Sequence, residues 1–420
     1  MSQRSRSVAL IATTALAAAG LAACSTPEPS PGVTEDTVTV GTHTPLTGPA
    51  AAGYSSISAA TKAYFDYVND NGGINGRNIE YIVKDDGYNP ATTSTVVREL
   101  VQEDEVFAVI NGLGTPTHSA VVDYLNENDV PDLFVASGSP KWDQPDTFPN
   151  TFAYNANYIV EAKALATYAQ ETWPDKTFCV LGQDDDFGTD FTTGLVQVLG
   201  ADGLASTQTY SVSVQDVVAQ VGAMQAAGCE VNFLATVNGF TALALGTAAK
   251  MKYGAQWVSS SSGGDYPTLV GYLGEDVAPL LLQASSAPTT CRSARTTRGS
   301  RCSRRSTTST TTAPRSAATR STGCPWATCS HRRWRRPATT RPARASSTRS
   351  RWAPDGQRHR AARLLDGQPR GVRGVGITVV DEGVQDYVDG EIYTTDAGNG
   401  PGRAYTGEAV ALEGDGIPTA

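Results

Sequence analysis

Hydrophobic and polar residues alternate with two different periods along residues 37–139. Short runs with the two-residue period of a strand lie at 37–46, 77–87, 106–112 and 130–139. Between them, apolar residues recur at helical spacing over 53–73, 90–104 and 117–129. Strands and helices that alternate through short loops predict a parallel sheet covered on both faces.

The same pattern starts again near residue 176. Strand-like runs at 176–183, 206–213, 229–239 and 255–264 alternate with helical stretches at 189–203, 214–228 and 240–254. The sequence therefore predicts a second open α/β lobe, joined to the first by a hinge. We expect lobe boundaries at 37–155 and 156–283, and a strand-like C-terminal segment at 375–420.

Ligands of such open sheets bind beyond the carboxyl ends of the strands. The corresponding loops are rich in Gly, Ser, Thr and Asn, which suits hydrogen bonding to a small polar ligand. The loops concerned are 44–54, 112–118, 136–141, 183–189, 236–241 and 259–265.

The N-terminus has the features of an export signal. Arg4 and Arg6 precede the apolar stretch "VALIATTALAAAGLAA", which ends in "LAAC" and is followed by the Pro-rich "STPEPSPG". The last motif resembles a bacterial lipobox, which implies cleavage after residue 23 and a lipid anchor on Cys24, with 24–36 as a linker. The alternative is an ordinary signal peptide with a chance cysteine.

Several motifs together resemble the type I periplasmic binding proteins of the leucine/isoleucine/valine-binding kind. They are "TPLTGPAAAGY", "NDNGGINGRNIEYIVKDDGYNP", "VINGLGTPTHSA", "VPDLFVASGSP" and "GQDDDFGTDF", and the resemblance covers about residues 37–283. It implies hinge closure of two lobes on a small polar solute, followed by delivery to an ABC permease. A ligand-sensing receptor with the same fold is the alternative function.

Charge divides the chain into two unlike parts. The chain carries −9 overall, but residues 291–373 contain 21 Arg, no Lys and two acidic residues, a net +19. The remainder therefore carries −28. The fold that the resemblance implies needs further α/β sequence in this place, so we interpret 284–374 as a frameshifted segment. The family length is kept, which favours paired compensating shifts.

The genetic code supports the frameshift interpretation. In the shifted frame, the codons that run into Cys324, Trp326, Cys329 and Trp334 encode Leu, Val or Met, and apolar positions then share one helix face. The other interpretations are a disordered tail, a glycosylated stalk, a nucleic-acid arm and a metal site at Cys324, Cys329 and His331. We expect no nucleic-acid partner, no cofactor and no metal site.

The resemblance places the main ligand contacts of the first lobe on the loops after its third and fourth strands. The corresponding residues are Gly114, Thr115, Ala136, Ser137 and Ser139. Thr115 either caps a helix alone or caps it and also binds ligand.

Tyr54 matches an aromatic residue of the family that closes over the ligand. The alternative is a tyrosine in the first turn of a helix that faces the core.

The second lobe departs from the family pattern. Phe187 keeps the expected ring without its hydroxyl, and "TVNG" offers Thr236 and Asn238 but no tyrosine. Ser261, in "WVSSSSGG", stands where the amino-acid binders have the Glu that receives the ammonium group. Asp184, Asp185 or Asp186 is a candidate substitute, so the solute is an amino acid, an amide or a related compound.

Enzymatic interpretations lack the residues they need. "DFG" occurs without a Gly-rich loop or a catalytic H-R-D, and His43 and His118 lie in loops on the ligand face without a nucleophile beside them. Cys179 and Cys229 either form a disulfide or remain buried thiols. We therefore predict a binding protein with no catalytic residues.

Overall fold

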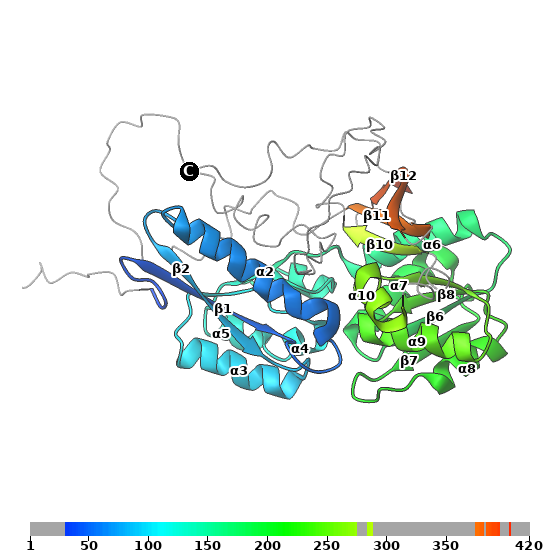
Figure 1. Cartoon of the computed structure of the whole chain (residues 1–420), viewed down its shortest axis with the longest axis horizontal. Coiled ribbons are helices and arrows are strands. Elements are labelled where there is room, and N and C mark those ends of the chain that lie inside the picture. The colour runs from blue at the N-terminus through cyan, green and yellow to red at the C-terminus, as the bar shows by residue number, and fades with distance from the viewer. Residues whose placement is uncertain (1–29, 275–283, 289–373, 382–383, 395–402, 405–420) are drawn as a thin grey trace, which may run out of the picture.

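The computed structural model describes residues 30–274, 284–288, 374–381, 384–394 and 403–404. These residues form two α/β lobes side by side, in blue to cyan and in green to orange in Figure 1. The predicted signal peptide, Cys24 and nearly all of the predicted frameshifted segment lie outside the described residues.

The first lobe is built on a five-stranded parallel sheet with the order β2-β1-β3-β4-β5. Its strands are β1 (Thr37–Thr44), β2 (Asn78–Asp85), β3 (Ala108–Ile110), β4 (Asp132–Val135) and β5 (Thr151–Ala153). Its helices are α2 (Ala51–Asp70), α3 (Pro90–Gln102), α4 (Thr115–Ser119), α5 (Val122–Glu127) and the 3-10 turn η1 (Pro140–Asp143).

Apolar side chains at helical spacing cover both faces of this sheet. On one face, α2 buries Tyr64, Phe65 and Val68 against β1, β3 and β4. On the other face, α3 buries Val97 and Leu100 against a separate cluster of side chains. The helix predicted at 117–129 is two helices, α4 and α5. The interruption is at Val121, whose φ of −131° is not helical and whose side chain is buried in the α3 cluster.

The second lobe contains an eight-stranded sheet with the order β13-β12-β11-β10-β9-β8-β6-β7. The strands are β6 (Phe178–Gln183), β7 (Ser206–Tyr210), β8 (Val231–Ala235), β9 (Gln256–Ser259), β10 (Ala284–Pro288), β11 (Gly374–Asp381), β12 (Val384–Thr394) and β13 (Arg403–Ala404). The helices are α6 (Tyr158–Thr172), α7 (Asp186–Leu199), α8 (Val218–Ala226), α9 (Asn238–Lys250) and α10 (Tyr266–Leu273).

The prediction of two α/β lobes is confirmed, and the second sheet continues beyond its predicted strands. β6 to β10 are parallel, whereas β11, β12 and β13 add to β10 in antiparallel fashion. The first five residues of the segment predicted at 284–374 therefore form a strand of the second lobe. No helix among the described residues is long and apolar enough to cross a membrane.

Cys179 and Cys229 form a disulfide, with 5.8 Å between their Cα atoms. Cys179 lies in β6 and Cys229 precedes β8, and these two strands are neighbours in the sheet. Of the two alternatives left open by the sequence, the structure shows the bonded one. A disulfide is typical of proteins in oxidising compartments.

Candidate functional site

The two lobes meet at the carboxyl ends of their parallel strands. One apolar cluster contains Ala50, Tyr88 and Leu113 of the first lobe together with Leu181 and Phe240 of the second. The predicted loops therefore lie at an interface that both lobes build. We call its polar core the interlobe site, made of Tyr54, Tyr88, Thr115, Ser137, Tyr158, Gln183 and Tyr210.

Two hydroxyls from the first lobe form one side of the interlobe site. Thr115 Oγ1 and Ser137 Oγ lie 2.8 Å apart, and both side chains are buried. Gly114, with a φ of 106°, occupies the N-cap position of α4, a conformation that favours glycine. The capping role predicted for Thr115 is therefore wrong, because its hydroxyl points to Ser137 instead.

Tyr158 brings the first turn of α6 into contact with these hydroxyls. Its hydroxyl lies 3.5 Å from Thr115 Oγ1, and its backbone N–H donates to the Gly138 carbonyl at 2.7 Å. Its ring packs on Phe187, with 4.4 Å between centroids. Phe187 therefore forms a buried wall of the site, a position that suits a ring without a hydroxyl.

Gln183 connects the floor of the second lobe to the first lobe. Its Nε2 donates to the Tyr88 hydroxyl at 3.4 Å, and its Oε1 accepts from the Tyr210 hydroxyl at 2.9 Å. The Tyr210 hydroxyl accepts in turn from the Val237 N–H at 3.2 Å. A tyrosine from β7 therefore lies against the "TVNG" loop, which carries none of its own.

Four phenols gather at the interlobe site, from Tyr54, Tyr88, Tyr158 and Tyr210. Burial raises the pKa of each phenol above its ordinary value, so all four are neutral at physiological pH. Negative charges raise three of these pKa values further: Asp265 and Glu161 act on Tyr54, and Asp185 acts on Tyr88 and Tyr210. Acidic groups therefore face the tyrosines from the second lobe.

Tyr54 joins the lobes at one rim of the interface. Its hydroxyl donates to the Ser262 carbonyl. It follows a kink in α2 at Ala52 and Gly53, where Gly53 has a φ of 88° and lies directly against the Asn238 amide. A β-carbon at Gly53 would collide with that amide, so the approach of the two lobes here depends on a glycine.

The opposite rim is held by polar contacts between η1 and α7. Ser139 Oγ donates to Asp190 Oδ2 at 2.7 Å, and Lys141 Nζ lies 3.0 Å from Asp186 Oδ2. Burial raises the pKa of Asp190 to about 6. Ser139 thus contacts the other lobe from the rim rather than from the centre of the site.

Glu161 lies where the second lobe offers only serines. Its Oε1 accepts from the Ser261 N–H at 2.6 Å, and the residue is 1% exposed. Ser261 therefore presents its backbone, not its hydroxyl, to a carboxylate that comes from α6.

The remaining predicted residues form hydrogen bonds along the interface. Thr236 Oγ1 is hydrogen-bonded to Thr241 Oγ1, and Asn238 Oδ1 accepts from the Asp265 N–H at 3.3 Å. Ala136 exchanges backbone hydrogen bonds with Gly112 and Gly114. The structure thus brings Thr115, Ser137 and Phe187 together around Tyr158, and Thr236, Asn238 and Ser261 lie farther along the edge of the second sheet.

The prediction that His43 and His118 lie in loops on the ligand face is wrong. His43 belongs to β1 and His118 to α4, and both are fully buried in the first lobe. Their ring nitrogens lie 3.0 Å apart, and each ring contacts a buried carboxylate at 2.8 Å, Asp86 for His43 and Asp132 for His118. They are internal hydrogen-bonding groups of the lobe.

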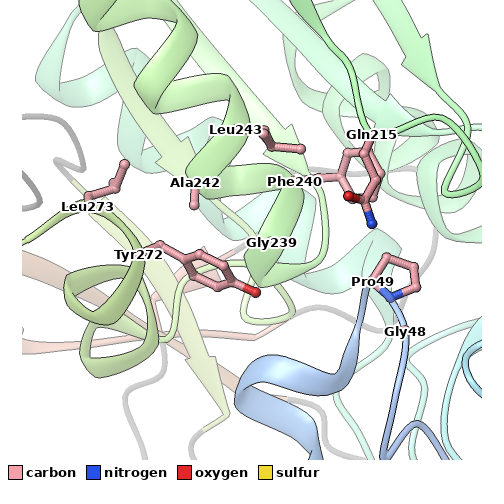
Figure 2. Close-up of a pocket in the computed structure, with 9 residues that line it drawn as sticks. All are labelled: Gly48, Pro49, Gln215, Gly239, Phe240, Ala242, Leu243, Tyr272 and Leu273. Atoms are coloured by element: carbon pink, nitrogen blue, oxygen red, sulfur yellow. The ribbon is translucent and has the colours of Figure 1, made fainter.

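A pocket of about 300 Å³ opens beside the interlobe site. Figure 2 shows Pro49 of the first lobe facing Tyr272 and the first turn of α9. The lining residues are Gly48, Pro49, Gln215, Gly239, Phe240, Ala242, Leu243, Tyr272 and Leu273. Because both lobes line it, the pocket must change shape whenever the lobes move apart.

The sequence interpretation missed Tyr88, Tyr158, Gln183, Tyr210 and Glu161. Tyr88 directly follows the "KDDG" turn and Gln183 ends a predicted strand, so their places in loops on the ligand face were a usable signal. No such signal marks Tyr158, Glu161 and Tyr210, which lie in ordinary helical or strand patterns.

Comparisons with known proteins agree with this architecture. The family model described as "Periplasmic binding protein" matches residues 37–305. The Leu/Ile/Val-binding protein homolog 3 of Brucella melitensis is 26% identical over 203 residues, which are 46% of this chain and 53% of that protein. The chain thus spans about half the length of this curated relative.

Two solved structures share the fold. An extracellular ligand-binding receptor from Rhodopseudomonas palustris HaA2 superposes with a TM-score of 0.62 at 17% identity, over 84% of this chain and all of that one. A fatty acid ABC transporter substrate-binding protein from Thermomonospora curvata gives 0.56 at 21% identity, over 62% and 67%.

The family model covers well over half of the chain, and the two lobes, their strand order and the site between them fit it. This family consists of substrate-binding proteins, not enzymes, in agreement with the prediction from the sequence. The chain belongs to the type I periplasmic binding protein family, as a distant homologue of the Leu/Ile/Val-binding proteins.

Proposed function

We propose that this protein binds a small polar solute between its lobes, outside the cytoplasm, and delivers it to an ABC permease. The observation that carries the proposal is the polarity of the interlobe site. Hydroxyls of Thr115, Ser137 and Tyr158 come together in a buried place, and Gln183 joins Tyr88 to Tyr210. Buried hydroxyls favour a ligand that hydrogen-bonds to them.

The polarity also favours an amino acid or an amide over a fatty acid. A hydrocarbon chain between these hydroxyls would leave buried donors and acceptors without partners, which costs binding free energy. A carboxylate or carbonyl beside Thr115 and Ser137 would satisfy them instead. The names of the relatives include both kinds of ligand, Leu/Ile/Val in one and fatty acid in another.

A ligand screen on the full chain tests this proposal. Amino acids, amides, urea and medium-chain fatty acids are compared by thermal shift, and the best ligand is then titrated by calorimetry. We expect a polar solute to bind, and Thr115→Ala and Ser137→Ala each to weaken it about tenfold or more. Thr95→Ala, on the exposed face of α3, is the matched control. Binding of fatty acids alone would contradict the polar-solute proposal.

The membrane attachment is proposed separately, from the lipobox at Leu21–Cys24. The disulfide between Cys179 and Cys229 supports an oxidising, extracytoplasmic location. Metabolic labelling with a radioactive fatty acid should mark the wild-type chain and not Cys24→Ala. Equal release of both proteins into the medium would contradict the anchor.

A further inference from the structure

Three consecutive acidic residues follow β6, and only the middle one faces the interlobe site. Asp184 and Asp186 are exposed, and Asp186 is at the rim with Lys141. Asp185 is half-buried, and its carboxylate accepts from Gln183, whose amide group also contacts the hydroxyls of Tyr88 and Tyr210. The run therefore provides one inward-facing carboxylate and two outward-facing ones.

Neutral donors hold the Asp185 carboxylate in place. Oδ1 accepts from the Phe187 N–H at 2.9 Å and so caps α7, while Oδ2 accepts from Gln183 Nε2 at 2.5 Å. Through Gln183, the carboxylate is linked to Tyr88 of the first lobe and to Tyr210. It therefore lies at the end of a hydrogen-bonded chain that crosses between the lobes.

Asp185 has no cation beside it among the described residues. No ion pair in this part of the chain includes it, and Lys141 is directed to Asp186. Burial raises the pKa of Asp185, and the neighbouring Asp186 carboxylate adds to this effect. A positive charge brought by a ligand would stabilise the ionised carboxylate further, since the described residues give it neutral donors and no cation.

We propose that Asp185 receives the positively charged group of the solute, so that the solute is an amino acid or another ammonium compound rather than an amide or a fatty acid. This inference rests on the proposed function of the interlobe site. In it, the hydroxyls of Thr115 and Ser137 take the acceptor end of the solute, and Asp185 takes the donor end beside Tyr88 and Tyr210. The carboxylate thus supplies the counter-charge that Ser261 does not.

The competing explanation is that Asp185 is only a helix cap. Asn caps helices about as well as Asp, so Asp185→Asn keeps the cap and removes the charge. Asp184→Asn, one residue away and exposed, removes the same charge outside the site and is the matched control.

The experiment titrates wild type, Asp185→Asn and Asp184→Asn with matched probes at pH 7.5. The probes are L-leucine, its amine-free analogue 4-methylpentanoate, and the neutral 4-methylpentanamide. If another solute binds best in the ligand screen, that solute and its amine-free and amide analogues take their place. We expect the ammonium compound to bind wild type and Asp184→Asn equally, within twofold. We expect Asp185→Asn to bind it 10- to 100-fold more weakly, as for loss of a charge-assisted hydrogen bond.

Each other outcome overturns a defined part of the proposal. If Asp185→Asn binds the ammonium compound as wild type does, Asp185 is only a cap. If only amine-free or amide probes bind wild type, the ligand class is wrong while the proposed function stands. If no solute of any class binds, the proposed function and this inference both fail.

A measurement on wild type alone keeps the test independent of how the variant folds. The titratable groups that face Asp185 are Tyr88, Tyr210, Asp186 and Asp190. Burial raises the pKa of Asp185, so affinity for the ammonium compound should fall as pH drops and Asp185 takes up a proton. Binding at acidic pH should then release protons, measured as a dependence of the binding heat on buffer ionisation. Asp190→Asn separates its contribution. Affinity that does not fall with pH while the protein stays folded would overturn the inference.

Discussion

The two lobes share an α/β plan but hold their sheets together by different means. In the first lobe, Asp86, His43, His118 and Asp132 form a fully buried hydrogen-bonded chain that links β1, α4 and β4 with the loop after β2. In the second lobe, the disulfide between Cys179 and Cys229 ties β6 to the chain entering β8. The first link consists of hydrogen bonds between titratable side chains, and the second is a covalent bond that requires oxidation of two thiols.

The difference shows how a polar link and a covalent link are used in the same architecture. The histidine chain contains three hydrogen bonds in a row, from Asp86 through His43 and His118 to Asp132. Thr93 and Thr151 donate to its two carboxylates at 3.1 and 2.9 Å. Such a network stabilises the lobe only when every member is present. A disulfide acts mainly by restricting the unfolded chain.

The largest expected effect comes from breaking the histidine chain. His118→Ala would leave Asp132 and His43 buried without their common partner, at a cost of about 3–5 kcal/mol in the free energy of unfolding. Chemical denaturation should measure this loss of stability, and hydrogen exchange should locate it in β1, β3 and β4. Thr93→Val removes one hydroxyl, shared between Asp86 at the edge of the chain and the Asn89 carbonyl, and should cost only about 1 kcal/mol. Equal effects of the two variants would contradict a cooperative network.

Removing the disulfide should have the next largest effect. Cys179→Ala with Cys229→Ala is expected to lower the free energy of unfolding by about 2–4 kcal/mol. A reductant should destabilise wild type by a similar amount and leave the double variant unchanged. Hydrogen exchange should accelerate in β6 to β8 and not in the first lobe. Equal acceleration of hydrogen exchange in both lobes would mean that the disulfide does not stabilise the second lobe locally.

Two glycines test whether the close approach of the lobes matters for binding. Gly53 and Gly72 both have a φ near 90°, but a β-carbon at Gly53 would meet Asn238 whereas one at Gly72 would meet nothing. Each change to Ala should cost about 1 kcal/mol of stability through backbone strain. Only Gly53→Ala should also weaken solute binding, by about tenfold or more. Equal affinities in the two variants would exclude a role of this contact in closure.

The smallest expected effect is a pH dependence at the rim. The folded-state pKa of Asp190 is raised to about 6 from an ordinary value near 3.8, so the folded protein binds this proton more tightly than the unfolded chain. The contribution of Asp190 to stability therefore increases as pH falls from about 6 toward 4. Asp190→Asn should remove that increase in thermal denaturation curves measured over this range. A slope that survives in the variant would assign it to other groups.

The alternation of strands and helices could be predicted because neighbouring residues carry the signal, with periods of two and about 3.6 residues. The antiparallel pairing at this end of the second sheet was harder to predict. β11 pairs with β10 across residues 289–373, and no local pattern reports such a partner. The same limit applies to His43 and His118, which are 75 residues apart in sequence and in contact in the fold.

The interlobe site was predictable where its residues directly follow strands. Thr115 begins α4 and Ser137 follows β4, both at the carboxyl edge of the first sheet, where the fold rule places ligands. Tyr158 enters the site only because the chain crosses to the second lobe just before α6, and Tyr210 only because β7 is an edge strand beside β6. These positions depend on topology, which a single sequence specifies weakly.

The pairing of β10 with β11 makes the Arg-rich stretch topologically separable. Pro288 and Val375 are partners in the antiparallel ladder, so the described chain leaves the second sheet and returns to it at one place. A turn of about four residues from Pro288 to Gly374 would preserve the order of every strand. By loop-closure entropy, so short a connection would favour folding by about 2–3 kcal/mol over the full-length one. The end of the β10–β11 ladder is therefore the place where a shorter connection would disturb the described strands least.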